Sequence, residues 1–182
     1  MNLCLPLVIY AAVQKHLGKP LEYPSDLAAW EANQTMSSAQ MNGYLAEWAV
    51  LTDKTEDESF NASDDCAFTW GKFWPKLAAR FQIPWTAPVN DPALYKIATT
   101  PYTPPPRGFG PPAKVQIRFT LVEWAKKPEV QQAWKELAEK HQLRDTSLGD
   151  IDRVFGFGDA AVACSYPVHF RYVTLSCRQT TC

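Results

Sequence analysis

The chain opens with the stretch MNLCLPLVIYAAVQKH (residues 1–16), around which the rest of the fold has to be arranged. Nearly every residue from Leu3 to Val13 is apolar, and a helix that is apolar all round is typical of a segment surrounded by other structure. Asn2 is the only candidate N-cap, and Pro6 lies where a first helical turn tolerates proline. We therefore predict a buried core helix here, and the rest of the chain must supply what buries it.

Two other interpretations of this stretch are weaker. A secretory signal has Lys or Arg before its apolar run, whereas here Lys15 follows the run. A membrane span needs roughly 20 apolar residues, and this run is about half as long. Five scattered cysteines without a CxxC pair are typical of reduced thiols in a cytosolic protein. We therefore expect a cytoplasmic protein with no membrane partner.

The composition indicates one folded domain. The chain has 182 residues, of which 46% are hydrophobic and 20% charged. Its net charge of -1 gives no electrostatic footprint for nucleic acid or an anionic membrane. The chain is rich in aromatic residues, with 7 Trp, 7 Tyr and 9 Phe, which suits a hydrophobic ligand cavity. A plain aromatic core is equally compatible with this composition.

Periodicity and caps predict the first half of the secondary structure. Ser37 or Ser38 caps a helix that ends near Leu51 and carries an apolar stripe. A short strand is expected over residues 58–62. Residues 70–81 form a second amphipathic helix, in which Pro75 should cause a kink. The apolar stripe of the first of these helices comprises Met41, Tyr44, Leu45, Trp48 and Ala49; Trp48, Trp70 and Trp74 are expected in the core.

The second half begins with a proline-rich segment. Nine prolines between Pro84 and Pro112 predict a long loop without regular helix or sheet, serving either as a lid or as a connector. Helices are then expected over residues 116–126, from Pro128 onward, and from Asp150 to about Ser165. A strand is possible over residues 170–175.

No catalytic arrangement follows from the residues alone. GFGDAA (residues 156–161) has the letters of a dinucleotide fingerprint, but only 21 residues follow it and they cannot complete the required strand–helix–strand unit. His16, His141 and His169 lie far apart and have no companion Ser or Cys motif, so we interpret them as surface or helix-end residues. No spacing of Cys and His suggests a metal site.

Four blocks taken together resemble one enzyme family. They are MNLCLPLVIYAAVQKHLGKPLEYP, LAAWEANQTMSSAQMNGYLAEWAV, ESFNASDDCAFTWGKFWPKLAARFQI and TLVEWAKKPEVQQAWKELAEKHQL. In order and approximate spacing they resemble the progesterone 5β-reductase and iridoid synthase-like branch of the extended short-chain dehydrogenases/reductases. The resemblance implies reduction of enones or ketones with NADPH held on an N-terminal Rossmann domain, commonly, in fungi, within secondary metabolism.

The resemblance covers only the later part of such an enzyme. It implies an α/β fragment, mostly helical with a few short strands, that corresponds to the substrate-binding domain and lacks the Rossmann core and the catalytic Tyr and Lys. Residues 1–168 would form this domain, including the proline-rich loop 84–112, and residues 169–182 a divergent tail. No cofactor is expected in this chain, and its catalytic residues remain unknown. The positions that match the family's substrate cavity are Met1, Ala49, Phe157, Ala160 and Ala161.

Three functions follow as hypotheses. The first is a truncated relative of an NADPH-dependent reductase that binds a small apolar carbonyl substrate from polyketide or terpenoid biosynthesis. The second is a cofactor-free isomerase or cyclase that uses the retained cavity, and the third is a non-catalytic binding subunit. Whether the chain is an enzyme by itself stays open. An apolar first helix left without cover predicts a homo-oligomer or a complex with a separate reductase-like chain.

Overall fold

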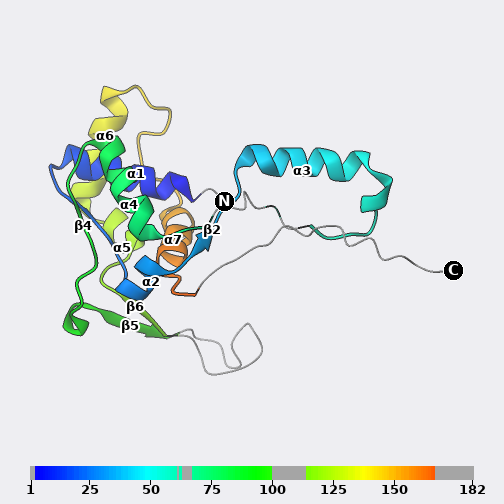
Figure 1. Ribbon diagram of the computed structural model, residues 1–182. Helices are drawn as coiled ribbons and strands as arrows, with labels where there is room; N and C mark the ends of the chain where they lie inside the picture. The colour runs from blue at the N-terminus through cyan, green and yellow to red at the C-terminus, as the bar shows by residue number, and fades with distance from the viewer. Residues whose placement is uncertain (1–2, 61, 63–66, 100–113, 167–182) are drawn as a thin grey trace. The chain divides into compact units, whose positions relative to one another are not determined.

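The computed structural model describes residues 3–60, 62, 67–99 and 114–166 (Figure 1). They belong to two compact units. The larger unit contains the described residues up to Ala32 and those from Trp70 to Tyr166, and the smaller unit contains those from Asn33 to Thr69. Within the described residues, helices combine with three two-stranded sheets. This is the mixture of helix and strand that the sequence predicts.

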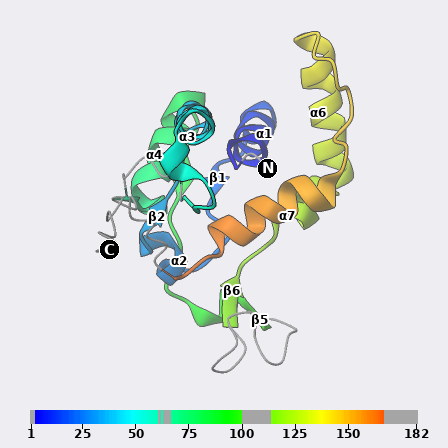
Figure 2. The same ribbon diagram turned by 90° about the vertical axis from the view of Figure 1, so that its right-hand side faces the viewer.

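Helix α1 (Cys4–His16) is the core helix of the larger unit. It packs against α4 (Trp70–Phe81), α6 (Pro128–Lys140) and α7 (Ile151–Val162). Figure 2 shows α1 nearly end-on, with α7 passing beneath it and α6 beside it. Leu7, Tyr10 and Val13 are almost completely buried. The prediction of a buried helix is therefore confirmed, with one exception: Leu5 and Val8 on another strip are 48% and 44% exposed.

A short parallel sheet lies beside these helices. Strand β1 (Leu21–Glu22) pairs in parallel with β4 (Trp85–Thr86), and α4 precedes β4 in the chain. The side chain of Gln14 donates to the carbonyl of Pro20 (2.7 Å), and the Tyr10 hydroxyl donates to that of Glu22 (3.1 Å). Side chains of α1 thus hydrogen-bond the carbonyls of Pro20 and Glu22, on either side of Leu21. These two carbonyls are therefore occupied and not available for pairing with a strand of another chain.

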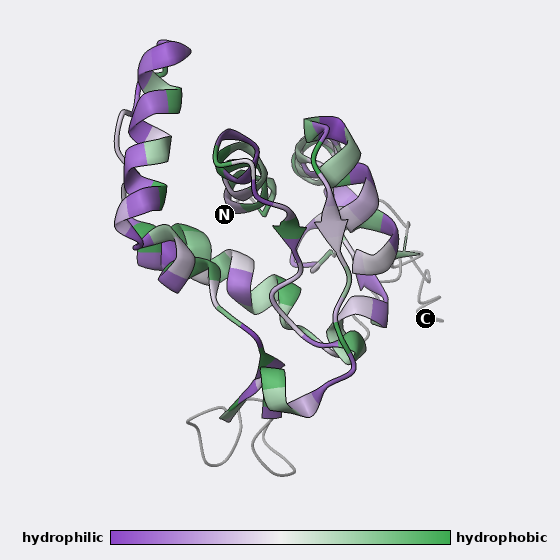
Figure 3. Cartoon of the chain, turned by 90° about the vertical axis from the view of Figure 1, so that its left-hand side faces the viewer, coloured by the Kyte–Doolittle hydropathy of each residue, from purple (hydrophilic) through white to green (hydrophobic). Residues whose placement is uncertain are grey.

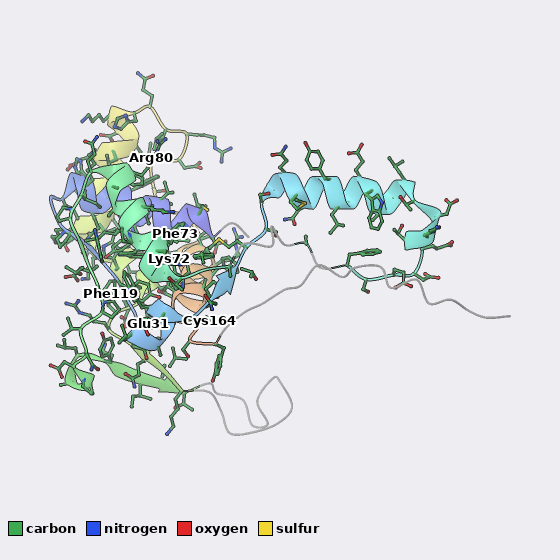
Figure 4. The ribbon with its side chains drawn as sticks, in the orientation of Figure 1. Glu31, Lys72, Phe73, Arg80, Phe119 and Cys164 are labelled. Carbon is green, nitrogen blue, oxygen red and sulfur yellow. The ribbon has the colours of Figure 1, made fainter. Side chains whose placement is uncertain are left out.

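Aromatic rings fill the centre of the larger unit. The Tyr23 ring contacts Trp30 of α2 (Leu27–Glu31) and Trp74 of α4 edge-on, at centroid distances of 4.8 and 5.1 Å. Trp74 also donates from Nε1 to the carbonyl of Leu21 (3.0 Å). Trp70 and Trp74 are buried, as predicted. Figure 4 labels Phe119, whose ring lies 6.3 Å from that of Tyr10.

The smaller unit contains α3 (Ala39–Leu51) and the short helix η1 (Asp53–Thr55), and its β2 (Gln34–Thr35) pairs antiparallel with β3 (Ala67–Phe68). The predicted helix and its Ser38 cap are confirmed, since Ser38 Oγ accepts from Met41 N–H (3.2 Å). The prediction that Trp48 lies in the core is wrong, because no α3 residue is buried. Periodicity shows that a face is apolar, and only tertiary contacts cover it.

The predicted strand over residues 58–62 is also wrong. Residues 58–60 and 62 have no regular structure, and the strand of this region is β3, which finds a partner in β2. A strand requires a partner for its backbone groups. Local composition alone did not show that residues 67–68, and not residues 58–62, would pair with another strand.

The proline-rich segment is more regular than predicted. Strand β4, the short helix η2 (Pro92–Leu94) and strand β5 (Lys96–Thr99) all lie between residues 84 and 99, so the prediction of a loop without regular structure is wrong there. The described prolines Pro84, Pro88 and Pro92 lie outside the strands, so they remove no ladder hydrogen bond. Residues 100–112 lie outside the described residues.

Strand β6 (Lys114–Ile117) pairs antiparallel with β5, so the helix predicted over residues 116–126 begins too early. The helix there is α5 (Leu121–Ala125), which starts at a capping box made by Thr120 and Glu123. Helices α6 and α7 confirm the predictions from residue 128 and from residue 150. The strand predicted over residues 170–175 lies outside the described residues.

Candidate functional site

A cleft of about 950 Å³ opens in the larger unit between α1, α6, α7 and the loop that joins α6 to α7. Trp134 of α6 lies on one side and Val154 of α7 on another, with Leu5 and Ile9 of α1 between the two helices in the lining. The loop contributes Leu143 and Leu148 among polar residues. Figure 3 shows hydrophobic and hydrophilic residues alternating along α6. The apolar lining is suited to a small hydrophobic molecule.

A close helix crossing fixes the cleft's wall. A Cβ atom at Gly158 would lie 3.0 Å from Pro6 Cγ and 3.2 Å from Leu121 Cδ1. Only a residue without a side chain lets α7 approach α1 and α5 so closely. One turn earlier, the buried Phe155 packs on Trp124 at a centroid distance of 5.9 Å. These contacts hold one face of α7 against the core, and Phe155 on this face also borders the cleft, together with Arg153 and Val154.

A carboxylate on α7 anchors α5. Asp159 accepts hydrogen bonds from the backbone N–H groups of Leu121 (2.6 Å) and Val122 (3.1 Å), which begin α5. Burial raises the pKa of Asp159 to about 6, and the two backbone donors oppose this rise. Asp159 therefore connects the two helices and does not face the cleft as a free acid or base.

The charged groups of the cleft pair with one another. Arg144 and Asp145 form an ion pair (3.0 Å), and Arg153 pairs with Asp150. Hydrogen bonding to Arg144 lowers the pKa of the Asp145 carboxyl. Trp134 Nε1 donates to the Asp145 carbonyl (3.2 Å), which ties the loop to α6. With each charge paired, the cleft favours a neutral apolar ligand over a charged one.

Three of the residues matched to the family's cavity lie farther along α7, outside the lining of the cleft. Phe157 and Ala161 follow Arg153 at intervals of four residues, and Ala160 follows Phe157 by three, so all lie on one helical face. Phe157 and Ala161 are half-buried and Ala160 is exposed. The structure thus places them on one helical face with Arg153, a residue of the cleft lining, while their role in binding stays a prediction.

The other two matched residues, Ala49 and Met1, do not belong to the described part of the larger unit. Ala49 is half-buried on α3 in the smaller unit, and Met1 lies outside the described residues. Sequence reasoning missed Trp134, Leu143 and Leu148. Val130, Trp134 and Leu137 recur at helical spacing on α6, and this signal identifies an apolar face without showing that part of it borders a cleft.

The segment at residues 156–161 lies in the middle of α7. It is not a turn between a strand and a helix, and Gly158 faces Pro6, which excludes a phosphate at that position. His16 and His141 lie at the ends of α1 and α6, as predicted, and His169 is outside the described residues. The described part of the chain contains no group of three His, Cys, Asp or Glu side chains that could hold a metal ion. Among the described helices, none is long and apolar enough to cross a membrane.

No protein-family model matches the chain. It is 28% identical to the 3-oxo-Delta(4,5)-steroid 5-beta-reductase of Arabidopsis thaliana over 159 residues, which is 87% of this chain and 34% of that protein. It is 27% identical to the (S)-8-oxocitronellyl enol synthase of Catharanthus roseus over 161 residues (88% and 34%). For the corresponding enzyme of Nepeta cataria the identity is 35% over 83 residues (46% and 21%).

The chain therefore spans about a third or less of these relatives' length. The similarities support a distant relationship to the progesterone 5β-reductase and iridoid synthase family.

Proposed function

We propose that this chain forms the substrate-binding part of an NADPH-dependent reductase that acts on small apolar enones or ketones in secondary metabolism. The observation that carries the proposal is the cleft with its apolar side chains, and Phe157, Ala160 and Ala161 lie farther along the same helix α7. The similarity to a steroid reductase over most of the chain supports the reaction class. The expectations of a fungal source, a C-terminal fragment and a cytoplasmic location are part of this proposal.

The cleft's task would be to bind and orient the substrate. The substrate's apolar body would be removed from water by contact with Leu5, Trp134 and Val154. Complete burial of an apolar group of the size of a Leu side chain is worth about 1.5–3 kcal/mol. The nicotinamide would supply the hydride. Because residues 156–161 do not fit a pyrophosphate, we propose that this chain alone does not bind NADPH tightly, and that the cofactor is held by a Rossmann domain.

A partner would complete such an enzyme. Leu5 and Val8 form an exposed apolar strip on α1, and surfaces of this kind are typical of interfaces. We therefore propose a homo-oligomer or a complex with a separate reductase-like chain. Light scattering of the purified chain tests this, and a monodisperse monomer at all concentrations would contradict it.

A cofactor-free isomerase or cyclase is a second candidate. It is favoured by the relatives named enol synthases and by a cleft that could act through positioning. A non-catalytic binding subunit is the third, and a stable complex without turnover would favour it.

The decisive experiment measures binding and turnover together. Calorimetric titration of the chain with neutral apolar enones should show binding, and Phe157→Ser or Val154→Ser should weaken it by about tenfold. Ile97→Ser, at an exposed position on β5, is the matched control and should leave the affinity unchanged.

The same protein is then incubated with enone, with and without NADPH. The proposal predicts no micromolar affinity for NADPH and no reduction by the chain alone. Conversion of the enone without NADPH would favour the isomerase or cyclase. Absence of binding by any enone, or equal weakening by Ile97→Ser, would overturn the assignment of the cleft.

A further inference from the structure

A second hollow adjoins the cleft and has a different chemistry. It has a volume of about 590 Å³ and lies where the C-terminal ends of α1, α4 and α6 meet. Its apolar lining includes Phe81, the last residue of α4, together with Trp134 and Leu137 of α6. The volume falls within the range of about 300–1,000 Å³ that is usual for small-molecule sites.

The hollow is bordered by basic side chains. Lys15, Lys140 and His141 contribute to its lining, and no acidic residue does. Within the described residues neither lysine forms an ion pair. His16, also in the lining, differs because its Nε2 lies 2.7 Å from Glu136 Oε2. The lining of the hollow therefore combines apolar side chains with two lysines that form no ion pair among the described residues.

Helix dipoles explain only part of this arrangement. Cations in the last turn of a helix are stabilising by themselves, which accounts for Lys15 on α1 and Lys140 on α6. The dipoles do not require a hollow with Phe81, Trp134 and Leu137 in its lining. Unpaired cations bordering an apolar hollow are complementary to a molecule that is anionic at one end and apolar at the other.

We propose that this hollow, the lysine pocket, binds an apolar anion, meaning a compound with a carboxylate or similar head and a hydrocarbon body. Lys15 and Lys140 bind the head, and Phe81, Trp134 and Leu137 contact the body. The proposal does not depend on reductase function. The lysine pocket shares Trp134 and Leu143 with the cleft, so the two sites are neighbours.

Titration with three ligands of equal chain length tests the proposal. Decanoate, decan-1-ol and decyltrimethylammonium are each added below their micelle concentrations and followed by calorimetry. Decanoate should bind about tenfold more tightly than decanol, and the cation should bind least. Equal affinity for the three compounds would overturn the proposal, because it would show apolar binding without recognition of charge.

Variants locate the site. The double variant Lys15→Gln/Lys140→Gln should reduce the affinity for decanoate to that for decanol, while decanol binding stays unchanged and shows that the fold is intact. Lys127→Gln, an exposed lysine outside the lysine pocket, is the matched control. An equal loss in the control, or no loss in the double variant, would contradict the proposal.

The two proposals fail separately. Phe157→Ser should weaken enone binding and leave decanoate binding unchanged, whereas the lysine variant should do the reverse. Loss of enone binding in the lysine variant would show that the lysine pocket and the cleft are one site, and would overturn the lysine pocket as a distinct one.

Discussion

The carboxylate of Asp159 on α7 lies 2.6 Å from the backbone nitrogen of Leu121, the first residue of α5. The second carboxylate oxygen accepts from Val122, and Thr120 Oγ1 accepts from Glu123 N–H (3.0 Å). The first three N–H groups of α5 therefore all have acceptors, two of which are the carboxylate oxygens of Asp159, 37 and 38 positions later in the chain. A five-residue helix has little stability by itself, so this tertiary cap holds it in place.

Replacing Asp159 tests the cap. Asp159→Ala leaves two N–H groups at a buried helix end without acceptors and should lower the free energy of unfolding by about 1–3 kcal/mol. Asp159→Asn keeps one acceptor oxygen and should therefore lower the free energy of unfolding by less than Asp159→Ala does. Urea unfolding followed by circular dichroism measures both variants, and a larger loss for Asn than for Ala would contradict this role.

Asp159 also makes the stability of the folded chain depend on pH. Burial raises the pKa of Asp159 from 3.8 to about 6 in the folded chain, so the folded state binds this proton more tightly than the unfolded state does. Its contribution to the free energy of unfolding is therefore greatest below about pH 4 and falls as the pH rises to about 6. The difference in unfolding free energy between wild type and Asp159→Asn, measured from pH 4 to 8, should change over this window and be flat above it.

The helix crossing predicts opposite effects for two nearby glycines. Gly158→Ala places a methyl group 3.0 Å from the rigid ring of Pro6, and such overpacking typically costs about 1–3 kcal/mol. At Gly156 the nearest atom, Val122 Cγ2, would be 3.9 Å away, so Gly156→Ala should stabilise the helix by up to about 1 kcal/mol. Thermal unfolding of the two variants should move the midpoint in opposite directions, and equal shifts would exclude a tight crossing.

A buried hydroxyl joins two distant segments. The Tyr23 hydroxyl donates to the carbonyl of Val162 (2.7 Å), at the end of α7, and burial raises the pKa of this phenol. Tyr23→Phe leaves that carbonyl without its donor and should cost about 1–2 kcal/mol of unfolding free energy. Tyr95→Phe removes a solvent-accessible bond to the Val89 carbonyl and should cost less than about 0.5 kcal/mol. If urea unfolding shows the same decrease in the free energy of unfolding for both variants, burial does not strengthen the Tyr23 hydrogen bond.

The long helices could be predicted from local sequence signals. Ser38, Pro128 and the apolar run from Leu3 to Val13 are local signals, and each predicts a helix that the structure contains. Such signals suffice because the hydrogen bonds of a helix join residues only four apart. A resemblance to known enzymes, and not periodicity, singled out Phe157, Ala160 and Ala161, which the structure then places on one face.

Only the tertiary structure decided the strands, the cleft and the connection between α5 and α7. The strands β1 and β4 are two residues each and 64 positions apart, so neither has a recognisable pattern without the other. The Asp159 cap and the Gly158 crossing also join residues from different elements. On α3 the sequence shows an apolar stripe, but no residue of this helix is buried. An apolar stripe in the sequence therefore does not show that the stripe is covered. Strand pairing, burial and cavities are properties of contacts between distant segments, and local sequence does not encode which segments meet.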